Sequence, residues 1–289
     1  MNFSVNVVLV SRPSPLNDAI GSQLTQRERP LVVMSMDDVQ TMDVKILRDA
    51  IVIDGDALAY LQCHNGFADD VHAQMLVRRR SLLQTCLAHD VPYLFLSDGR
   101  VFDGCLAHTG DCAEHDDIEP ASLAGKQLAE YERLVMADAG QGVVLRTGPL
   151  IASREGNFLG DCLATMREGK VLALNDALMS CPTPVSDFAR VISGIVDQLS
   201  CGAPCRGAYH YCSSGSASAY EFAEVVCAFA SQFVTPVADI AADEAGVTWQ
   251  PSVPALSCNQ ILQDFGIKQL PWRAYLPRMV RAVCEGGSK

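Results

Sequence analysis

The sequence has no long hydrophobic run and comparatively few basic residues. No apolar stretch reaches the roughly 18 residues that a membrane-spanning helix needs, so a membrane segment is not expected. The 22 lysines and arginines are outnumbered by 34 aspartates and glutamates, which gives a formal net charge of −12. Binding to nucleic acid needs clustered positive charge, and the single basic run is 78–80. Neither nucleic acid nor a membrane is therefore expected as a partner.

The amino terminus lacks the basic region and the A-x-A cleavage site of a secretory signal peptide. It reads MNFSVNVVLVSRPS, which is typical of a first strand. The twelve cysteines are scattered through otherwise globular segments. Disulfides persist in oxidising compartments, so without an export signal we expect reduced thiols in a cytoplasmic protein.

Short runs of Val, Ile and Leu alternate with stretches of helical periodicity. The runs predict strands and the periodic stretches predict helices. Such alternation predicts an α/β fold, a doubly wound parallel sheet with helices on both faces. The predicted strands are 5–10, 31–34, 51–53, 93–96 and 143–145, and the clearest predicted helices are 69–89 and 121–137.

The pattern loosens after about residue 148, where turns such as SREGN and SCPTP separate shorter helices. A chain of 289 residues is long enough for two modest cores. We therefore expect a first domain over 1–148 and a smaller, mixed domain over 149–289. Some segments of the second half are expected to return to the first sheet.

Six stretches, in order over nearly the whole chain, resemble one family. They are SDGRVFDG, EPASLAGKQLAEYE, VVLRTGPLIASREGNFL, CPTPVSDFARVI, GAYHYCSSGSASAYEFAEVV and FGIKQLPWRAYL. Together they resemble the dTDP-4-dehydrorhamnose reductase (RmlD-like) branch of the extended short-chain dehydrogenase/reductases. The resemblance implies a Rossmann-like, dinucleotide-binding-type first domain for NADP or NAD. It also implies a second domain of the kind that binds a sugar nucleotide.

The segment expected to hold the cofactor departs from the family pattern. A dinucleotide site needs a glycine-rich turn that lets backbone N–H groups approach the pyrophosphate. Here the segment reads VSRPSPLNDAIGSQL, with Pro15 and Asp18 at two of the glycine positions. Ser11, Arg12 and Gly21 remain as the candidates of a degenerate site. This composition argues against conventional binding of NADP or NAD.

The catalytic positions implied by the resemblance depart as well. In the family, a tyrosine four residues before a lysine donates a proton, and the lysine lowers the phenol pKa. Lys126 is retained, as a catalytic and cofactor-binding candidate, but Ser122 stands at the tyrosine position and is too weak an acid. Tyr131 points about 140° away around a helix. Asp98 stands at a threonine position, where its carboxylate would repel a developing oxyanion.

Two functions of different classes follow from the resemblance. The leading hypothesis is a family member that has lost reductase chemistry and acts as a binding or regulatory protein. Its ligand would be an unidentified protein partner or a sugar nucleotide, and a homodimer follows only by analogy with the family. The alternative is an active NAD(P)-dependent sugar-nucleotide reductase or epimerase with a rearranged site. That alternative predicts an open cavity near Ser11, Arg12 and Gly21.

A third hypothesis concerns cysteine and histidine. Cys105, His108, Cys112 and His115 form a C-x₂-H-x₃-C-x₂-H pattern, which offers soft zinc ligands on one face if the segment is helical. The pattern predicts a metal or thiol site. Incidental loop residues are the alternative, because Gly110 and Asp111 favour a turn. A weaker grouping consists of Cys201, Cys205, His210 and Cys212.

Overall fold

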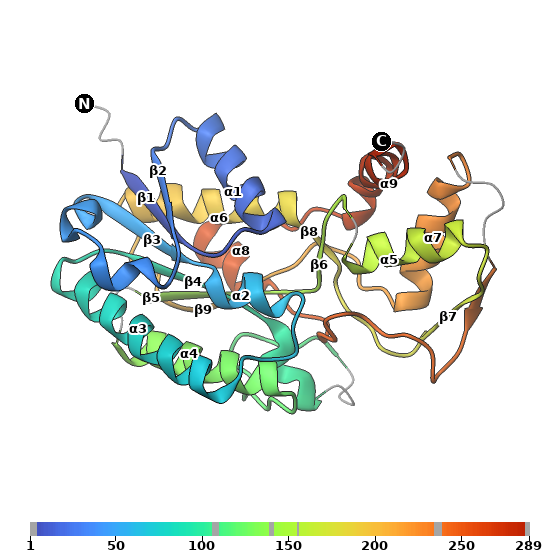
Figure 1. Cartoon of the computed structure of the whole chain (residues 1–289), viewed down its shortest axis with the longest axis horizontal. Helices are drawn as coiled ribbons and strands as arrows, with labels where there is room; N and C mark the ends of the chain where they lie inside the picture. The colour runs from blue at the N-terminus through green and yellow to red at the C-terminus, as the bar shows by residue number, and fades with distance from the viewer. Residues whose placement is uncertain (1–4, 106–109, 139–141, 155, 234–238, 287–289) are drawn as a thin grey trace.

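The fold is built on a six-stranded parallel sheet (Figure 1). The structure is a computed structural model that describes residues 5–105, 110–138, 142–154, 156–233 and 239–286. The strand order is β2-β1-β3-β4-β5-β9, and each neighbouring pair is parallel. The strands are β1 (Asn6–Val10), β2 (Leu31–Met34), β3 (Ala50–Asp54), β4 (Tyr93–Asp98), β5 (Gly142–Thr147) and β9 (Gly207–Tyr211).

Helices cover both faces of this sheet. α1 packs against α6 on one face, and α3 packs against α4 on the other (Figure 1). The bounds are α1 (Pro15–Gln26), α2 (Asp56–Leu61), α3 (Asp69–Ala88), α4 (Leu123–Asp138), α6 (Val185–Ser200) and α8 (Asn259–Phe265). The predicted α/β, doubly wound architecture is confirmed, and the strands and helices named from the sequence lie within two residues of those observed.

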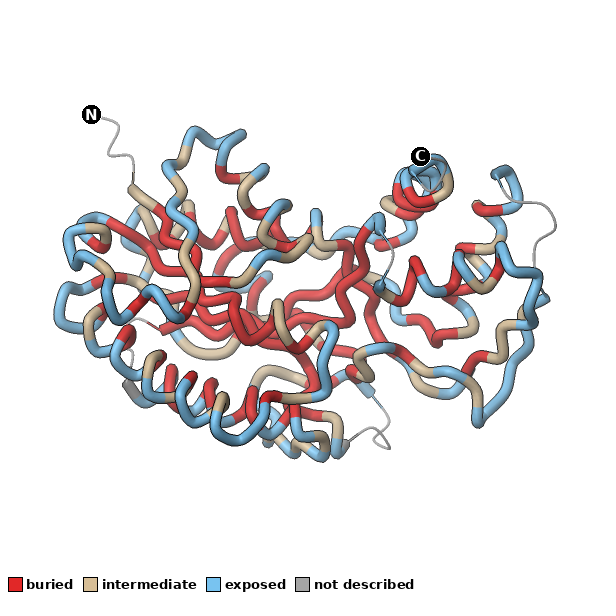
Figure 2. The backbone as a smooth tube through the Cα atoms, viewed as in Figure 1, coloured by how far each residue is buried: buried red, intermediate tan, exposed pale blue. Residues whose placement is uncertain are grey.

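The central strands form the core because helices shield them on both sides. Every residue of β3 and β4 is buried, and the sheet interior stands out as the buried region in Figure 2. Strands that are buried on two faces consist mostly of consecutive apolar residues, and this pattern made them predictable from the sequence. β2 is an edge strand, and Val33 is 54% exposed there. The chain continues from it into the short 3₁₀ helices η1 (Asp38–Thr41) and η2 (Val44–Leu47).

A second apolar cluster lies beside the sheet (Figures 1 and 2). It is centred on aromatic contacts, with Phe222 5.0 Å from Trp249 and 5.2 Å from Trp272 between ring centroids. Its elements are α5 (Phe158–Arg167), α7 (Ala219–Ala230), α9 (Leu276–Gly286), the 3₁₀ helix η4 (Trp272–Ala274) and the parallel pair of β7 (Leu172–Leu174) and β10 (Ile240–Ala242).

The second half of the chain contributes to both clusters. α6, β9 and α8 follow residue 149 but bury their apolar side chains in the first core. A short parallel pair of β6 (Leu150–Ile151) and β8 (Thr183–Pro184) runs between the two units. Among the described helices, none is long and apolar enough to cross a membrane.

The strand order fixes where a ligand would bind. β1 pairs with β2 on one side and with β3 on the other, so the strands that follow β1 in sequence are added first on one side of it and then on the other. In open α/β sheets, ligands bind outside the carboxyl ends of the strands at such a switch point. A ligand is therefore expected at the turns that follow β1 and β3.

Candidate functional site

A cavity of about 330 Å³ opens at this switch point. Its volume falls in the range of roughly 300–1,000 Å³ that small-molecule sites occupy. Most of its lining comes from three segments: the β1–α1 turn, the end of α2 with the residues after it, and the loop between β6 and α5. The main lining residues are Arg12, Pro13, Ser14, Pro15, Tyr60, Gln62, His64, Leu150, Ala152, Arg154, Asn157 and Val185.

The β1–α1 turn presents a helix N-terminus to the cavity without a glycine-rich turn. Ser14 caps α1, because its extended backbone lets the side chain accept a hydrogen bond from the Asn17 N–H. Pro15 occupies the first turn and has no N–H to offer a phosphate. Ser11 is buried and donates to the Arg12 carbonyl oxygen. Gly21 faces β2, where a Cβ would meet Leu31 at 3.6 Å.

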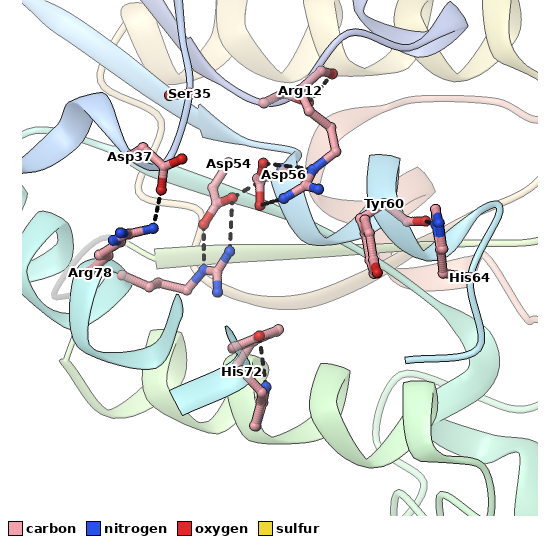
Figure 3. A network of polar contacts seen from close by, with 12 residues as sticks. Arg12, Ser35, Asp37, Asp54, Asp56, Tyr60, His64, His72 and Arg78 are labelled. Carbon is pink, nitrogen blue, oxygen red and sulfur yellow. Dashed lines mark hydrogen bonds and ion pairs between the residues drawn. The ribbon is translucent and has the colours of Figure 1, made fainter. Parts of the chain in front are cut away.

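The Arg12 side chain forms one wall of the cavity, and its charge already has a partner. Its Nε and Nη2 donate to the two carboxylate oxygens of Asp56, at 3.1 and 3.0 Å (Figure 3). The guanidinium carbon lies 4.6 Å from the ring centre of Tyr60, which in turn stacks on His64 at 4.0 Å. Arg154, from the loop before α5, is an exposed second guanidinium in the lining.

Below this pair, the carboxylate that ends β3 is held inside the protein. Asp54, labelled in Figure 3, accepts hydrogen bonds from Arg79 Nε at 2.5 Å and from the Tyr93 hydroxyl at 2.5 Å. All three side chains are buried. Burial lowers the pKa of Arg79, but the charge of Asp54, its hydrogen bonds and the neighbouring tyrosines together outweigh burial, so the net shift is upward. The Asp54 carboxylate is therefore an anchor between β3, β4 and α3.

Asp98 stands at the position where the family resemblance implies a threonine, and its side chain is engaged inside the protein. Its carboxylate is fully buried and accepts from Arg100 Nε at 3.0 Å to each oxygen and from Nη2 at 2.5 Å. Arg100 also donates to the Leu61 carbonyl oxygen at 2.9 Å. The ion pair turns this carboxylate toward Arg100, and the expectation that it would repel a substrate oxyanion stays a prediction.

Ser122 has a structural role at the start of α4. Its hydroxyl accepts from the Gly125 N–H at 3.0 Å, the contact that a helix-capping serine makes. Its own N–H donates to the Asp103 carboxylate. Lys126, on the next turn, is exposed. The structure therefore places a cap where the family has its proton donor.

Tyr131 lies in the core and is not among the residues that line the cavity. Its hydroxyl is 2.7 Å from His72 Nδ1 on α3, and the Arg79 guanidinium carbon lies 4.1 Å from its ring centre. Burial raises the pKa of this phenol to about 12. A family-type proton donor needs the opposite shift, so the sequence-based exclusion of Tyr131 agrees with its surroundings.

The predicted metal ligands differ sharply in exposure. Cys112 is buried, and its N–H donates to the Ala255 carbonyl oxygen, whereas the His115 side chain is 87% exposed. His108 and the side chain of Cys105 lie outside the described residues. Within the described part of the chain, no group of three or more His, Cys, Asp or Glu is placed to hold a metal ion.

The second cysteine grouping is divided as well. Cys201 is exposed at the end of α6, and His210 pairs with Arg146 in the sheet. Cys212 instead contacts Cys258, which lies 46 residues along the chain. Sequence spacing gave no signal for that contact, because it forms where the end of β9 meets the start of α8.

A doubly wound sheet with a cavity at its switch point and a small second unit beside it defines an extended short-chain dehydrogenase/reductase fold. The family model for the RmlD substrate binding domain matches residues 63–284, and the chain belongs to this family. The resemblance noted in the sequence is thereby confirmed.

The chain is similar to curated and solved members of the wider group. It is 28% identical over 211 residues to the dTDP-4-dehydrorhamnose reductase of Aggregatibacter actinomycetemcomitans, with 71% of each chain covered. The solved structure of the dTDP-4-dehydrorhamnose reductase of Bacillus anthracis, in complex with NADP, superposes with a TM-score of 0.77 and is 17% identical in sequence. The match covers 98% of this chain and 99% of that one. The solved structure of UDP-glucose 4-epimerase of Thermotoga maritima, in complex with UDP-glucose, superposes with a TM-score of 0.74 and is 13% identical. The match covers 98% of this chain and 100% of that one.

Proposed function

We propose that this chain binds a nucleotide-type ligand in the switch-point cavity and does not carry out the reduction step of its relatives. The observation that carries the proposal is that neither candidate on α4 is placed to donate a proton to a ligand. Ser122 caps α4 through Gly125, while the tyrosine of that helix, Tyr131, is bonded to His72 in the core. The cavity itself persists at about 330 Å³.

The cavity lining suits an anionic nucleotide. The N-terminus of α1 favours negative charge, and Arg154 adds an exposed guanidinium. Arg12 and Asp56 neutralise each other, so Asp56 does not oppose a phosphate. His64 is an aromatic ring of the lining on which a base can stack, whereas the Tyr60 ring already stacks on His64 and Phe67. Relatives of this fold bind NADP and UDP-glucose, which supports nucleotides as the ligand class.

The reduction of a carbonyl requires a proton at the oxygen as well as a hydride at the carbon. A positioned acid contributes about 10²–10⁴ in rate, and the family places it four residues before the lysine. Here Ser122 occupies that position and its hydroxyl oxygen is engaged by a backbone N–H. The same contacts favour a binding or regulatory role for the chain over catalysis.

An active sugar-nucleotide reductase with a rearranged site is the second candidate. The open cavity beside Arg12 and the exposed Lys126 favour it. An active enzyme consumes NADPH when a sugar nucleotide is supplied, and a binding protein does not. The two candidates thus differ in one measurable quantity, the rate of NADPH oxidation.

The experiment is a thermal melt of the full chain with NADPH, NADH, dTDP-sugars and UDP-sugars, followed by an NADPH oxidation assay. A ligand at 100 times its dissociation constant stabilises the fold by about 2.7 kcal/mol, a readily measured shift. A shift without NADPH oxidation is the expected result. A shift with turnover supports the reductase instead. A chain that no nucleotide stabilises contradicts both and directs the search to a protein partner.

A further inference from the structure

Two buried thiols from distant segments are in contact beside a second cavity. Cys212 directly follows β9, and Cys258 directly precedes α8. Their Sγ atoms are 3.5 Å apart, and the Cys212 N–H donates to the Cys258 sulfur at 3.3 Å. A disulfide bond is about 2.0 Å long, so this contact must shorten by about 1.5 Å for the bond to form. The two sulfurs are therefore placed as a candidate disulfide pair.

We propose that Cys212 and Cys258 are a peroxide-sensitive pair, in which Cys258 is oxidised first and Cys212 then closes the disulfide. The second cavity has a volume of about 220 Å³, and Cys258 belongs to its lining whereas Cys212 does not. Cys258 is 7% exposed and Cys212 is fully buried. The lining includes Asp111, Ser257 and Gln269, so the cavity is polar enough to admit peroxide. This inference is independent of the nucleotide site.

The hydrogen bonds around the two sulfurs fit this order. The Cys258 sulfur accepts from the Cys212 N–H, and such a bond is stronger when the acceptor carries negative charge. The Leu256 carbonyl oxygen lies 3.5 Å from the Cys212 sulfur, as an acceptor for its proton, and 3.8 Å from the Cys258 sulfur. Gln269 Nε2 donates to the Cys212 carbonyl oxygen at 2.9 Å and lies 3.7 Å from the sulfur of that residue.

The chemistry balances with hydrogen peroxide as the oxidant. Cys258 reacts as a thiolate, the attacking form of cysteine, after its proton passes to water. The thiolate attacks one peroxide oxygen, the O–O bond breaks, and hydroxide leaves, which gives a sulfenic acid. The Cys212 sulfur then attacks the Cys258 sulfur, the S–O bond breaks, and the hydroxide takes the Cys212 proton and leaves as water. In total, two thiols lose two electrons and two protons, and the peroxide becomes two waters.

The bridge would join the edge of the main sheet to the segment before α8. β9 is the last strand in the sheet order, and α8 packs against it. Cys212 and Cys258 are 46 residues apart, and closing a loop of that length restricts the unfolded chain. The oxidised pair would thus hold α8 against β9, and a thiol reductant would release it.

The experiment treats the folded full chain with equimolar hydrogen peroxide, blocks the remaining thiols during denaturation and maps the products by mass spectrometry. Trypsin followed by a glutamate-specific protease isolates Cys212 in residues 207–221 and Cys258 in residues 245–268. The expected result is a cross-link between these two peptides that reduction reverses. Absence of this cross-link in the oxidised wild-type chain overturns the proposal. The same treatment in urea should give a lower yield, and an equal yield there would mean that the fold does not direct the pairing.

Cys181 provides the matched control, because it lines the same cavity and is 5% exposed. Cys181→Ser should leave the cross-link unchanged, whereas Cys212→Ser and Cys258→Ser should each abolish it. A cross-link that joins Cys258 or Cys212 to residues 171–190, the peptide of Cys181, contradicts the proposed pair.

The single variants also test the order of oxidation. In Cys212→Ser, excess peroxide should leave added oxygen on the sulfur of Cys258, because no second thiol closes the bridge. In Cys258→Ser, Cys212 should stay a free thiol, since it does not line the cavity. The reverse pattern would show that Cys212 reacts first and would overturn the assigned roles.

Discussion

Arg100 folds back onto Asp98, two residues before it, and its Nε lies 3.0 Å from both oxygens of that carboxylate. The Asp98 side chain is fully buried, and that of Arg100 is 5% exposed. The pair closes the turn that follows β4, where the family resemblance implies a threonine. The end of this strand is thus held by an internal ion pair.

Removal of the carboxylate should be costly. Asp98→Ala leaves the Arg100 guanidinium buried without its partner, and breaking a buried pair in this way typically costs about 3–5 kcal/mol. Urea unfolding followed by circular dichroism measures the change. The control is Lys170→Ala, which breaks an exposed pair with Glu168 and should cost no more than about 1 kcal/mol. Equal effects for the two variants would contradict a structural role for Asp98.

Ser122 should behave as a helix cap. Ser122→Ala removes the acceptor for the Gly125 N–H, and we expect a loss of about 1 kcal/mol in the free energy of unfolding. Ser122→Asp restores a carboxylate acceptor at the same place and should recover most of that loss. Both values come from urea titrations. If the two variants are equally destabilised, the hydroxyl does not act through capping.

The fold could be predicted because its signals are local. β3 and β4 are buried on both faces, so each begins with four consecutive apolar residues before the polar residues at its carboxyl end. α3 was placed within one residue, because its apolar positions recur at helical spacing between strands of known extent. Strand–helix alternation then leaves few topologies, since parallel connections are right-handed.

The site could be predicted only in part, because its contacts are distant in sequence. A serine at position 122 was enough to argue against a proton donor there, because a hydroxyl of this kind is too weak an acid. The ion-pair partner of Arg12 could not be predicted from the sequence, because Asp56 is 44 residues away and the pair forms only when β1 and β3 lie side by side. The resemblance implied a place beside a substrate for Asp98, but the sequence did not show that its side chain pairs with Arg100.

Ligand binding in the nucleotide cavity should depend on Arg154. This side chain is exposed in the lining, so Arg154→Ala removes positive charge with little effect on stability. Loss of one charged contact to a phosphate should raise the dissociation constant about tenfold, which corresponds to about 1.4 kcal/mol of binding free energy. Isothermal titration with NADPH, and with any sugar nucleotide that shifts the melt, measures it. Arg133→Ala, an exposed arginine of α4, should bind as wild type. Unchanged affinity in Arg154→Ala would place the phosphates elsewhere.

His210 should make stability depend on pH. It is buried in β9, with Nε2 3.2 Å from Arg146 Nη1 and Nδ1 3.1 Å from the Ser257 carbonyl oxygen. A neutral ring that donates from Nδ1 and accepts at Nε2 satisfies both contacts. Burial, followed by the charge of Arg146, lowers the pKa of His210 to about 3 from the ordinary 6.5. The folded protein therefore holds this ring without a proton.

The sign of the effect follows from proton counting. Between pH 6.5 and about 3, the unfolded chain binds a proton at His210 that the folded chain does not. The contribution of the neutral ring is complete above pH 6.5 and is lost as the pH falls through this window, with a slope of up to about 1.4 kcal/mol per pH unit. Urea unfolding at a series of pH values measures the slope. His210→Gln cannot titrate, so its slope should be shallower by that amount. Parallel slopes for the two proteins would mean that His210 is already protonated in the folded state.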